Sequence, residues 1–278
     1  MIRGYDVTVV ADQENTGEPE VLAAVDRTMR TIEMLADAAD GMSISSIARA
    51  LDVNKQIAAR ILNTLHLKGY LFQLPNQSYK LTYKVSNIAF RQQITARLSD
   101  QCMPLLQKLA DETGELVRLA IVEERKPIWL LAVVGRTQNA RLRLEPGGPK
   151  DVLPHAHAVG KVMLASLGDD EIRQVLGPEP YPQETLHTRT GWDRLSADIR
   201  EAQEMGYGIS CEEAELGIVA IAAPVRAPLA NSLSAIVSVA APSPRANRAT
   251  LIAMAPKLLD VAKQLGEVWP LVLSGTRK

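Results

Sequence analysis

The sequence predicts an α+β protein with an N-terminal winged helix-turn-helix, a helical linker and a C-terminal α/β domain. Apolar residues recur at helical spacing in three segments between residues 20 and 65, and they alternate in the manner of short strands after Gly69. Beyond Gly114, further strands are interspersed with helices. At 278 residues, the chain is long enough for about two domains, each with its own core.

The first part of the chain is expected to be a flexible tail over residues 1–18, followed by the winged helix-turn-helix over residues 19–84. The tail ends in a polar, acidic stretch without helical period. The first helix is predicted from Glu20, and its buried face is expected to consist of Leu22, Val25, Met29, Ile32, Leu35 and Ala36. We expect this helix to pack behind the helix-turn-helix.

Residues 43–81 carry the signals of the helix-turn-helix and of its wing. Ser43 and Asn54 are residue types that cap helix N-termini, and each precedes an apolar stripe at helical spacing. The stripe of the second of these helices is Ile57, Ile61, Leu62 and Leu65. After Gly69, two alternating segments flank a turn at residues 75–78, which predicts a small antiparallel wing.

The outward side of this second helix carries side chains of the kinds that read DNA. Residues 41–95 hold seven Lys or Arg and one acid, a net charge of +6, whereas residues 1–40 hold three bases and nine acids. A basic module of this size is typical of proteins that bind phosphates. The predicted DNA-binding residues are Ser45, Lys55, Gln56, Arg60, Asn63 and, in the wing, Lys80. The alternative is a purely structural three-helix unit with solvated lysines.

The remaining chain is expected to form a linker helix over residues 85–112 and an effector-binding domain over residues 113–278. Pro104 predicts a break or a kink in the linker. Strands of the second domain are predicted over residues 116–122, 128–134, 140–144, 217–225 and 234–240. Helices are predicted over residues 156–167, 169–176, 191–205 and 248–268.

Composition argues against a membrane or a secreted protein. No apolar run reaches the roughly 18 residues of a membrane span, and the N-terminus is acidic rather than basic and then apolar. Cys102 and Cys211 are far apart and have no metal or redox spacing, which fits a reducing cytosol.

Two motifs of the second domain raise the question of metal binding or catalysis. His155 and His157 have the spacing of two ligands on one side of a strand, but a metal site needs a third ligand. That ligand would have to be His187, Cys211 or Glu212. Residues 210–213 (Ser-Cys-Glu-Glu) offer nucleophiles, but they lack the Gly-x-Ser-x-Gly turn and an identifiable base. We expect no metal, no cofactor and no catalytic residue.

Other features are relevant to an anionic ligand. Arg141 and Arg143 offer a carboxylate clamp, although arginines at a strand edge are more often exposed and structural. Gly147-Gly148 is too short to cradle a phosphate. The helix that begins near His157 directs free N–H groups and partial positive charge at its start, which favours a small anion or a carbonyl.

Four stretches in this order, residues 24–37, 43–71, 155–167 and 204–225, resemble the IclR family of transcriptional regulators. The resemblance extends over roughly residues 20–268. Members of the family are bacterial cytoplasmic regulators, usually dimers or tetramers. They have an N-terminal winged helix-turn-helix and a C-terminal effector domain that resembles a GAF or PAS fold. The resemblance implies the same architecture here.

In that family the effector lies between a helix-start loop and a later loop with its strand. Carried over by position, the effector-binding residues are Ala158, Val159 and Gly160 on one side and Ser210, Ile218 and Ala220 on the other. His157, at the start of the same helix, is included in the predicted site. Members that resemble the glyoxylate and pyruvate sensor have Asp in place of Ser210 and Cys in place of Ala220. Loss of both polar contacts suggests a bulkier ligand such as an aromatic acid. Its apolar lining would be Trp129, Leu131 and Leu142.

The sequence thus indicates a cytoplasmic, DNA-binding regulator of a catabolic operon, a repressor or an activator that responds to a small organic acid. One reading helix covers few base pairs, so we expect a homodimer or a dimer of dimers on a palindromic operator. One alternative is an enzyme whose second domain acts on a small metabolite while the first binds a partner. Another is a protein-interaction module, which would show no salt-dependent DNA binding.

Overall fold

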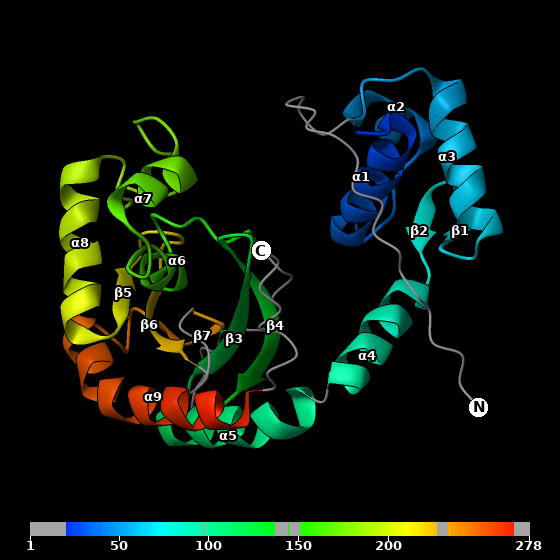
Figure 1. Ribbon diagram of the computed structural model, residues 1–278. Coiled ribbons are helices and arrows are strands. Elements are labelled where there is room, and N and C mark those ends of the chain that lie inside the picture. The colour runs from blue at the N-terminus through cyan, green and yellow to red at the C-terminus, as the bar shows by residue number, and fades with distance from the viewer. Residues whose placement is uncertain (1–20, 97, 137–143, 145–150, 227–232, 270–278) are drawn as a thin grey trace, which may run out of the picture. The chain divides into compact units, whose positions relative to one another are not determined.

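The computed structural model describes residues 21–96, 98–136, 144, 151–226 and 233–269 (Figure 1). The chain divides into two compact units, Met1–Phe90 and Arg91–Lys278, and each has its own hydrophobic core. No helix in the described ranges is long and apolar enough to cross a membrane.

The N-terminal unit is a winged helix-turn-helix, as predicted. Its helices are α1 (Ala23–Asp37), α2 (Ile44–Ala50) and α3 (Lys55–Leu67), and its antiparallel wing pairs β1 (Leu71–Gln73) with β2 (Tyr79–Leu81). Helix α4 (Lys84–Ala96) follows the wing. The core includes Leu35, Ile47, Leu62, Leu65 and Leu71.

Local hydrogen bonds explain where α2 and α3 begin. The Ser43 Oγ accepts a hydrogen bond from Ser46 N at 3.2 Å, and the Asn54 Oδ1 accepts one from Ile57 N at 2.9 Å. Both bonds satisfy N–H groups that have no partner within the helix. The two predicted caps are therefore confirmed.

The apolar face predicted for α1 is buried only near the end of the helix. Leu35 is 2% exposed, whereas Leu22, Val25 and Met29 are 68%, 56% and 54% exposed. Ala36 is exposed as well. The expectation of one continuous buried face is wrong, because the helical period identifies an apolar stripe but not what covers it.

The C-terminal unit is the predicted α/β domain. Five strands form one antiparallel sheet in the order β4-β3-β7-β6-β5. Its elements are α5 (Leu98–Thr113), β3 (Leu116–Glu123), β4 (Lys126–Val134), α6 (Ala158–Leu164), α7 (Asp169–Leu176), α8 (Trp192–Met205), β5 (Gly208–Cys211), β6 (Ile218–Val225), β7 (Ala235–Pro242) and α9 (Arg248–Val268).

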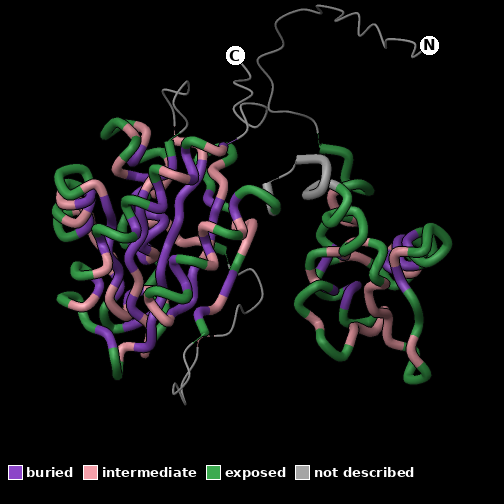
Figure 2. The backbone as a smooth tube through the Cα atoms, turned by 90° about the horizontal axis from the view of Figure 1, so that it is seen from below, coloured by how far each residue is buried: buried purple, intermediate pink, exposed green. Residues whose placement is uncertain are grey.

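Helices cover both faces of this sheet. Helices α5 and α9 lie side by side on one face, and α6 packs on the other with α8 beside it (Figure 1). The strands between these layers are mostly buried (purple in Figure 2). Alternate residues of a strand therefore belong to two clusters, one under α5 and α9 and one under α6. We call the side of the sheet that α6 covers the α6 face.

Three predicted details differ from or fall outside the structure. Helix α5 continues through Pro104, so the proline does not break it. The predicted strand at residues 140–144 lies outside the described residues, apart from Leu144, which is not in a strand. The sequence does not predict β5, because its four residues include Gly and Ser, which have little strand preference; pairing with β6 fixes it.

Candidate nucleic-acid interface and effector site

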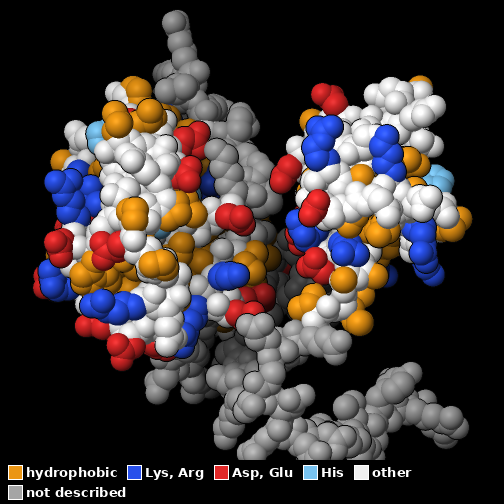
Figure 3. All heavy atoms as spheres, turned by 90° about the horizontal axis from the view of Figure 1, so that it is seen from above, with side chains coloured by type: hydrophobic (Ala, Val, Ile, Leu, Met, Phe, Trp, Pro, Cys, Tyr) orange, Lys and Arg blue, Asp and Glu red, His pale blue; other side chains and the backbone are white. Residues whose placement is uncertain are grey.

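Helix α3 presents four polar side chains to solvent. Lys55, Gln56, Arg60 and Asn63 are exposed. The buried residues of the helix are Ala58, Ile61, Leu62 and Leu65. In helix-turn-helix proteins the second helix enters the major groove, and these are side chains that can contact base edges there. Figure 3 shows Lys and Arg side chains (blue) and exposed hydrophobic ones (orange) on the visible face of the N-terminal unit.

The other two predicted DNA-binding residues lie outside α3. Ser45 is exposed in the first turn of α2, and Lys80 is half-buried in β2. Nearby Lys84 is engaged within the unit: its Nζ donates to the Lys68 carbonyl oxygen at 2.6 Å and lies 4.6 Å from the centre of the Tyr70 ring. Lys84 therefore joins the start of α4 to the segment between α3 and β1.

Several of the predicted effector residues meet on the α6 face. Ala158 and Val159 of α6 pack in one apolar cluster with Trp129 of β4 and Ala220 of β6. Ser210 pairs with Ala220 across β5 and β6, so both side chains lie on the same face.

Two further members of this set, His157 and Ile218, lie next to these residues in the chain. His157 is the residue before α6 and is half-buried. Ile218 is two residues before Ala220 in β6, and it is also half-buried.

A β-bulge in β4 separates Leu131 from Trp129. Leu119 pairs with Leu131, and the next residue, Ala120, pairs with Trp129, so Leu130 is an extra residue in β4. In a regular strand, residues 129 and 131 would share a face. The bulge instead turns Leu131 to the cluster under α5 and α9, while Trp129 stays on the α6 face. The structure contradicts the expectation that both line one ligand site.

Gly160 and Ser210 hold α6 against its neighbours. A Cβ on Gly160 would stand 2.4 Å from the Pro154 Cα, so the close approach of the two segments requires glycine. Ser210 is 5% exposed, and its Oγ donates to the Ala156 carbonyl oxygen at 2.6 Å. The Ser210 proton is therefore engaged with the backbone, and its oxygen is left as an acceptor.

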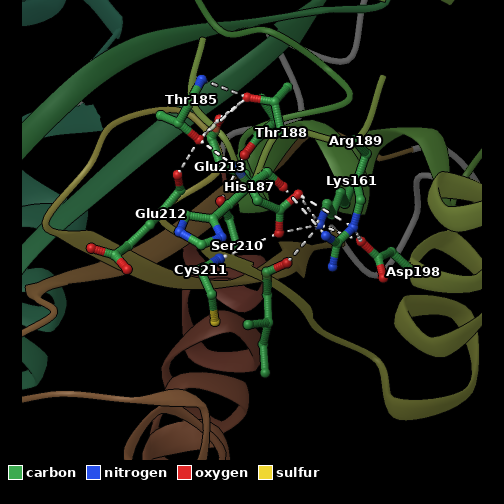
Figure 4. Close-up of polar contacts among 12 residues, drawn as sticks. Lys161, Thr185, His187, Thr188, Arg189, Asp198, Ser210, Cys211, Glu212 and Glu213 are labelled. Atoms are coloured by element: carbon green, nitrogen blue, oxygen red, sulfur yellow. Dashed lines mark hydrogen bonds and ion pairs between the residues drawn. The ribbon is translucent and has the colours of Figure 1, made fainter. Parts of the chain in front are cut away.

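A buried lysine of α6 joins two acids (Figure 4). Lys161 is 1% exposed, and its Nζ lies 2.6 Å from Asp198 Oδ2 and 2.8 Å from Glu213 Oε1. The same Nζ donates to the Ile209 carbonyl oxygen at 3.1 Å. Arg189 Nε donates to Asp198 Oδ2 at 2.9 Å. These four charged side chains connect α6 with α8 and with the segments before α8 and after β5.

The two acids of this network respond differently to burial. Burial opposes the ionisation of Asp198, but Lys161 and Arg189 together outweigh it and hold the pKa of that carboxyl below its ordinary value. At Glu213 burial dominates and raises the pKa above its ordinary value in spite of the same two cations. Burial therefore opposes the charge of Glu213 more strongly than that of Asp198.

Glu212 has a structural role in the loop after β5. Its Oε1 accepts a hydrogen bond from Gly217 N at 2.8 Å, and that bond is the main reason why the pKa of this carboxyl is lowered. Its carbonyl oxygen accepts a hydrogen bond from Thr185 Oγ1 at 2.6 Å. These contacts shape the loop.

His155 and His157 have separate partners. His155 is 3% exposed, and its Nε2 is 2.8 Å from the Pro182 carbonyl oxygen. Leu153 N donates to His157 Nδ1 at 3.1 Å. Within the part of the chain that the structure describes, no three His, Cys, Asp or Glu side chains gather to hold a metal ion. Burial raises the pKa of the Cys211 thiol, which disfavours the nucleophilic thiolate.

Both units match a known family. Residues 94–267 match the family described as bacterial transcriptional regulator IclR C-terminal, and residues 24–75 match the IclR helix-turn-helix domain. The chain belongs to the IclR family. Proteins of this family are transcriptional regulators and not enzymes, so the enzyme alternative is set aside.

IclR-family relatives resemble the chain over most of its length. The HTH-type transcriptional regulator XynR of Escherichia coli K12 is 27% identical over 207 residues, which are 74% of this chain and 81% of XynR. The Pca regulon regulatory protein of Pseudomonas putida is 23% identical over 214 residues, 77% of this chain and 72% of its own. An IclR homolog from Microbacterium hydrocarbonoxydans, solved in complex with 4-hydroxybenzoate, shares the fold. Its TM-score is 0.69 at 21% identity, and the match covers 87% of this chain and 98% of that one.

Leu142, Arg141, Arg143 and the Gly147-Gly148 pair lie outside the described residues.

Sequence patterns do not single out two cations of this IclR-family domain, Lys161 and Arg118. All seven residues of α6 are buried, and one of them is Lys161. A buried ammonium group requires acidic or hydrogen-bonding partners. The partners Asp198 and Glu213 follow 37 and 52 residues later, so no periodicity reveals them. Arg118 of β3 lies on the α6 face and would be found by asking which polar residues interrupt that apolar surface.

We expect His157 to make the regulator sensitive to mild acid. Burial lowers the pKa of His157 below its ordinary value of 6.5, and the positive charge of Arg118 contributes. As the pH falls through 6.5, the unfolded chain takes up this proton before the folded chain does, so the free energy of unfolding decreases. Each unit of pKa difference corresponds to about 1.4 kcal/mol.

Urea denaturation between about pH 7.5 and about pH 5.5 measures this effect. The variant H157N should lose less stability over that range than the wild type. The control H187N, at an exposed histidine, should keep the wild-type pH dependence. Equal pH dependence in H157N and the wild type would rule out the assignment to His157.

Proposed function

We propose that this IclR-family regulator binds a palindromic operator through α3 and that a small aromatic acid on the α6 face changes that binding. It would act in the cytoplasm and control a catabolic operon. The observation that carries the proposal is the exposed set on α3, Lys55, Gln56, Arg60 and Asn63, in a helix whose start is fixed by a side-chain cap.

The α3 side chains suit base edges in the major groove. Arginine pairs with the O6 and N7 atoms of guanine, and asparagine and glutamine pair with adenine. Lys80 in the wing and Ser45 at the start of α2 suit phosphate groups, which position a protein on the duplex without reading its sequence.

Exposed apolar side chains support self-association of the regulator. Leu22 just before α1 and Val25 and Met29 within it are more than half exposed. Tyr83 just before α4 and Phe90 within it are 90% and 59% exposed. Large apolar side chains gathered on a surface favour contact with another protein surface. We propose a second copy of the chain as that partner, in a homodimer or a dimer of dimers.

The small side chains on the α6 face and the names of two relatives support an aromatic acid as the effector. Ser210 and Ala220 stand where keto-acid sensors of the family have Asp and Cys, and Trp129 adds an aromatic surface. One relative is named for the Pca regulon, and another was solved with 4-hydroxybenzoate. Tight binding of pyruvate in calorimetry, without binding of any aromatic acid, would refute this ligand class.

Binding to the chain's own upstream intergenic DNA tests the whole proposal. We expect specific binding that weakens steeply with salt and that changes on addition of one aromatic acid. Footprinting should protect two half-sites about 10 base pairs apart, or a multiple of that distance, as a symmetric dimer requires. Absence of sequence preference at every salt concentration would contradict the proposal.

We expect R60A to weaken operator binding by about 1–3 kcal/mol, because a bidentate contact to guanine is lost. The control R30A removes the same side-chain type from α1, where Arg30 is paired with Asp26 at 3.9 Å, and it should change operator affinity much less. Electrophoretic mobility shifts with operator and scrambled DNA measure both variants. Unchanged operator affinity in R60A would remove Arg60 from the reading set.

A further inference from the structure

Arg118 is a cation placed among small and apolar side chains. Along β3, Val117 and Leu119 pack under α5 and α9, so Arg118 and Ala120 face α6. Arg118 pairs with Ser238 of β7, which is 3% exposed. Arg118 itself is half-buried.

The Arg118 guanidinium is held by an aromatic ring. Its Cζ lies 5.2 Å from the centre of the Trp129 ring, within the range of a cation–π contact. Burial lowers the pKa of Arg118, and the charge of Glu215 opposes this effect. The ion pairs between residues with described positions do not include this guanidinium.

Other arginines of this unit are neutralised directly. Arg189 donates to Asp198 at 2.9 Å, and Arg245 makes two hydrogen bonds of 2.7 Å to the Glu115 carboxylate. Burial of a charge costs free energy unless the charge is paired, so a partly desolvated guanidinium gains from a bound anion. The planar guanidinium matches a carboxylate with two parallel hydrogen bonds.

We propose that Arg118 binds the carboxylate of the effector and that Trp129 holds the guanidinium in position for it. This inference rests on the function proposed above and names the residue that selects the ligand class. Ser238 of β7 pairs with Arg118 on one side and with Ala222 of β6 on the other. Two residues along the same strands, Ala240 pairs with Ala220. The flat body of the acid lies beside Ala220, which is only half-buried, with its carboxylate at Arg118.

Calorimetry with matched acids and amides tests this proposal on the full chain. The probes are benzoate, 4-hydroxybenzoate, benzamide and 4-hydroxybenzamide. The wild type should bind the better acid about 10- to 100-fold more tightly than its amide, as expected for a hydrogen bond to a charged group. The variant R118Q should lose this preference.

Arg173 provides a matched control. It is exposed on α7, and its Cζ also lies 5.2 Å from the centre of a tryptophan ring, that of Trp192. The variant R173Q should keep the wild-type preference for the acid. A second readout is the pKa of His157 by NMR: the acid should raise it by neutralising Arg118, and the amide should not.

Each outcome separates this inference from the broader proposal. Equal binding of an acid to R118Q and to the wild type overturns the role of Arg118 but leaves an aromatic-acid effector in place. If R118Q does not fold, equal binding of acid and amide by the wild type overturns the inference by itself. Failure of all four probes to bind the wild type overturns the ligand class as well, whereas operator binding is tested separately.

Discussion

Replacement of Lys161 by methionine should destabilise the C-terminal unit by about 3–5 kcal/mol. The Lys161 Nζ contacts Asp198, Glu213 and the Ile209 carbonyl oxygen, and its removal leaves Glu213, which is only 3% exposed, without its closest cation. Arg189 cannot replace it where it stands, because its Nε is 3.9 Å from Glu213. Urea denaturation followed by tryptophan fluorescence measures the loss, since all three tryptophans belong to this unit.

The pH dependence of K161M identifies Glu213 as the cause. Burial already raises the pKa of Glu213 above 4.5, and loss of Lys161 should raise it further. When the pKa of a carboxyl is higher in the folded than in the unfolded chain, the protein has its full free energy of unfolding at a pH below the pKa of the unfolded chain. The free energy of unfolding then decreases as the pH rises. The deficit of K161M should therefore be smallest near pH 4.5 and grow toward neutral pH, and E213Q in the K161M background should recover part of it.

An exposed lysine of the same unit controls for the charge change. Lys257 is 53% exposed, and its Nζ is 3.6 Å from Glu112. K257M should cost less than about 1 kcal/mol, as is usual for surface ion pairs. Equal stability of K161M and K257M would show that the buried network does not depend on Lys161.

Replacement of Leu62 by alanine should destabilise the N-terminal unit by about 2–5 kcal/mol and abolish operator binding at physiological temperature. Leu62 is 0% exposed in the core beneath α3 and contacts no solvent. The unit is small, so a cavity in its core removes a large fraction of its total stability. Hydrogen exchange of the α3 amides measures this effect, because fluorescence of the tryptophans reports on the other unit.

The matched control for this change lies on the same helix. Leu67 is 76% exposed, and L67A should alter stability by no more than about 0.5 kcal/mol. R60A provides the opposite contrast, since it should weaken operator binding while α3 exchanges at the wild-type rate. Wild-type exchange in L62A would contradict the assignment of Leu62 to the core.

The sequence by itself determined the helix-turn-helix. Ser43 and Asn54 form their cap bonds within three residues, and the apolar stripe of α3 follows from its own period, so local chemistry is sufficient. The exposure of Lys55, Gln56, Arg60 and Asn63 follows from the same geometry. The neighbourhood of Ala158, Val159 and Ala220 was predicted by family resemblance rather than by pattern.

Only the tertiary structure decided the details of the α6 face, because its neighbours come from distant parts of the chain. The extra residue Leu130 turns Leu131 away from Trp129, and a strand period of two residues cannot anticipate a bulge. Lys161 finds its acids 37 and 52 residues later, and Arg118 lies against Trp129 because β3 and β4 pair in one particular register. The positions of such charged side chains depend on helix packing and strand register. These bring together residues that are distant in sequence, so a local pattern does not reveal the contacts.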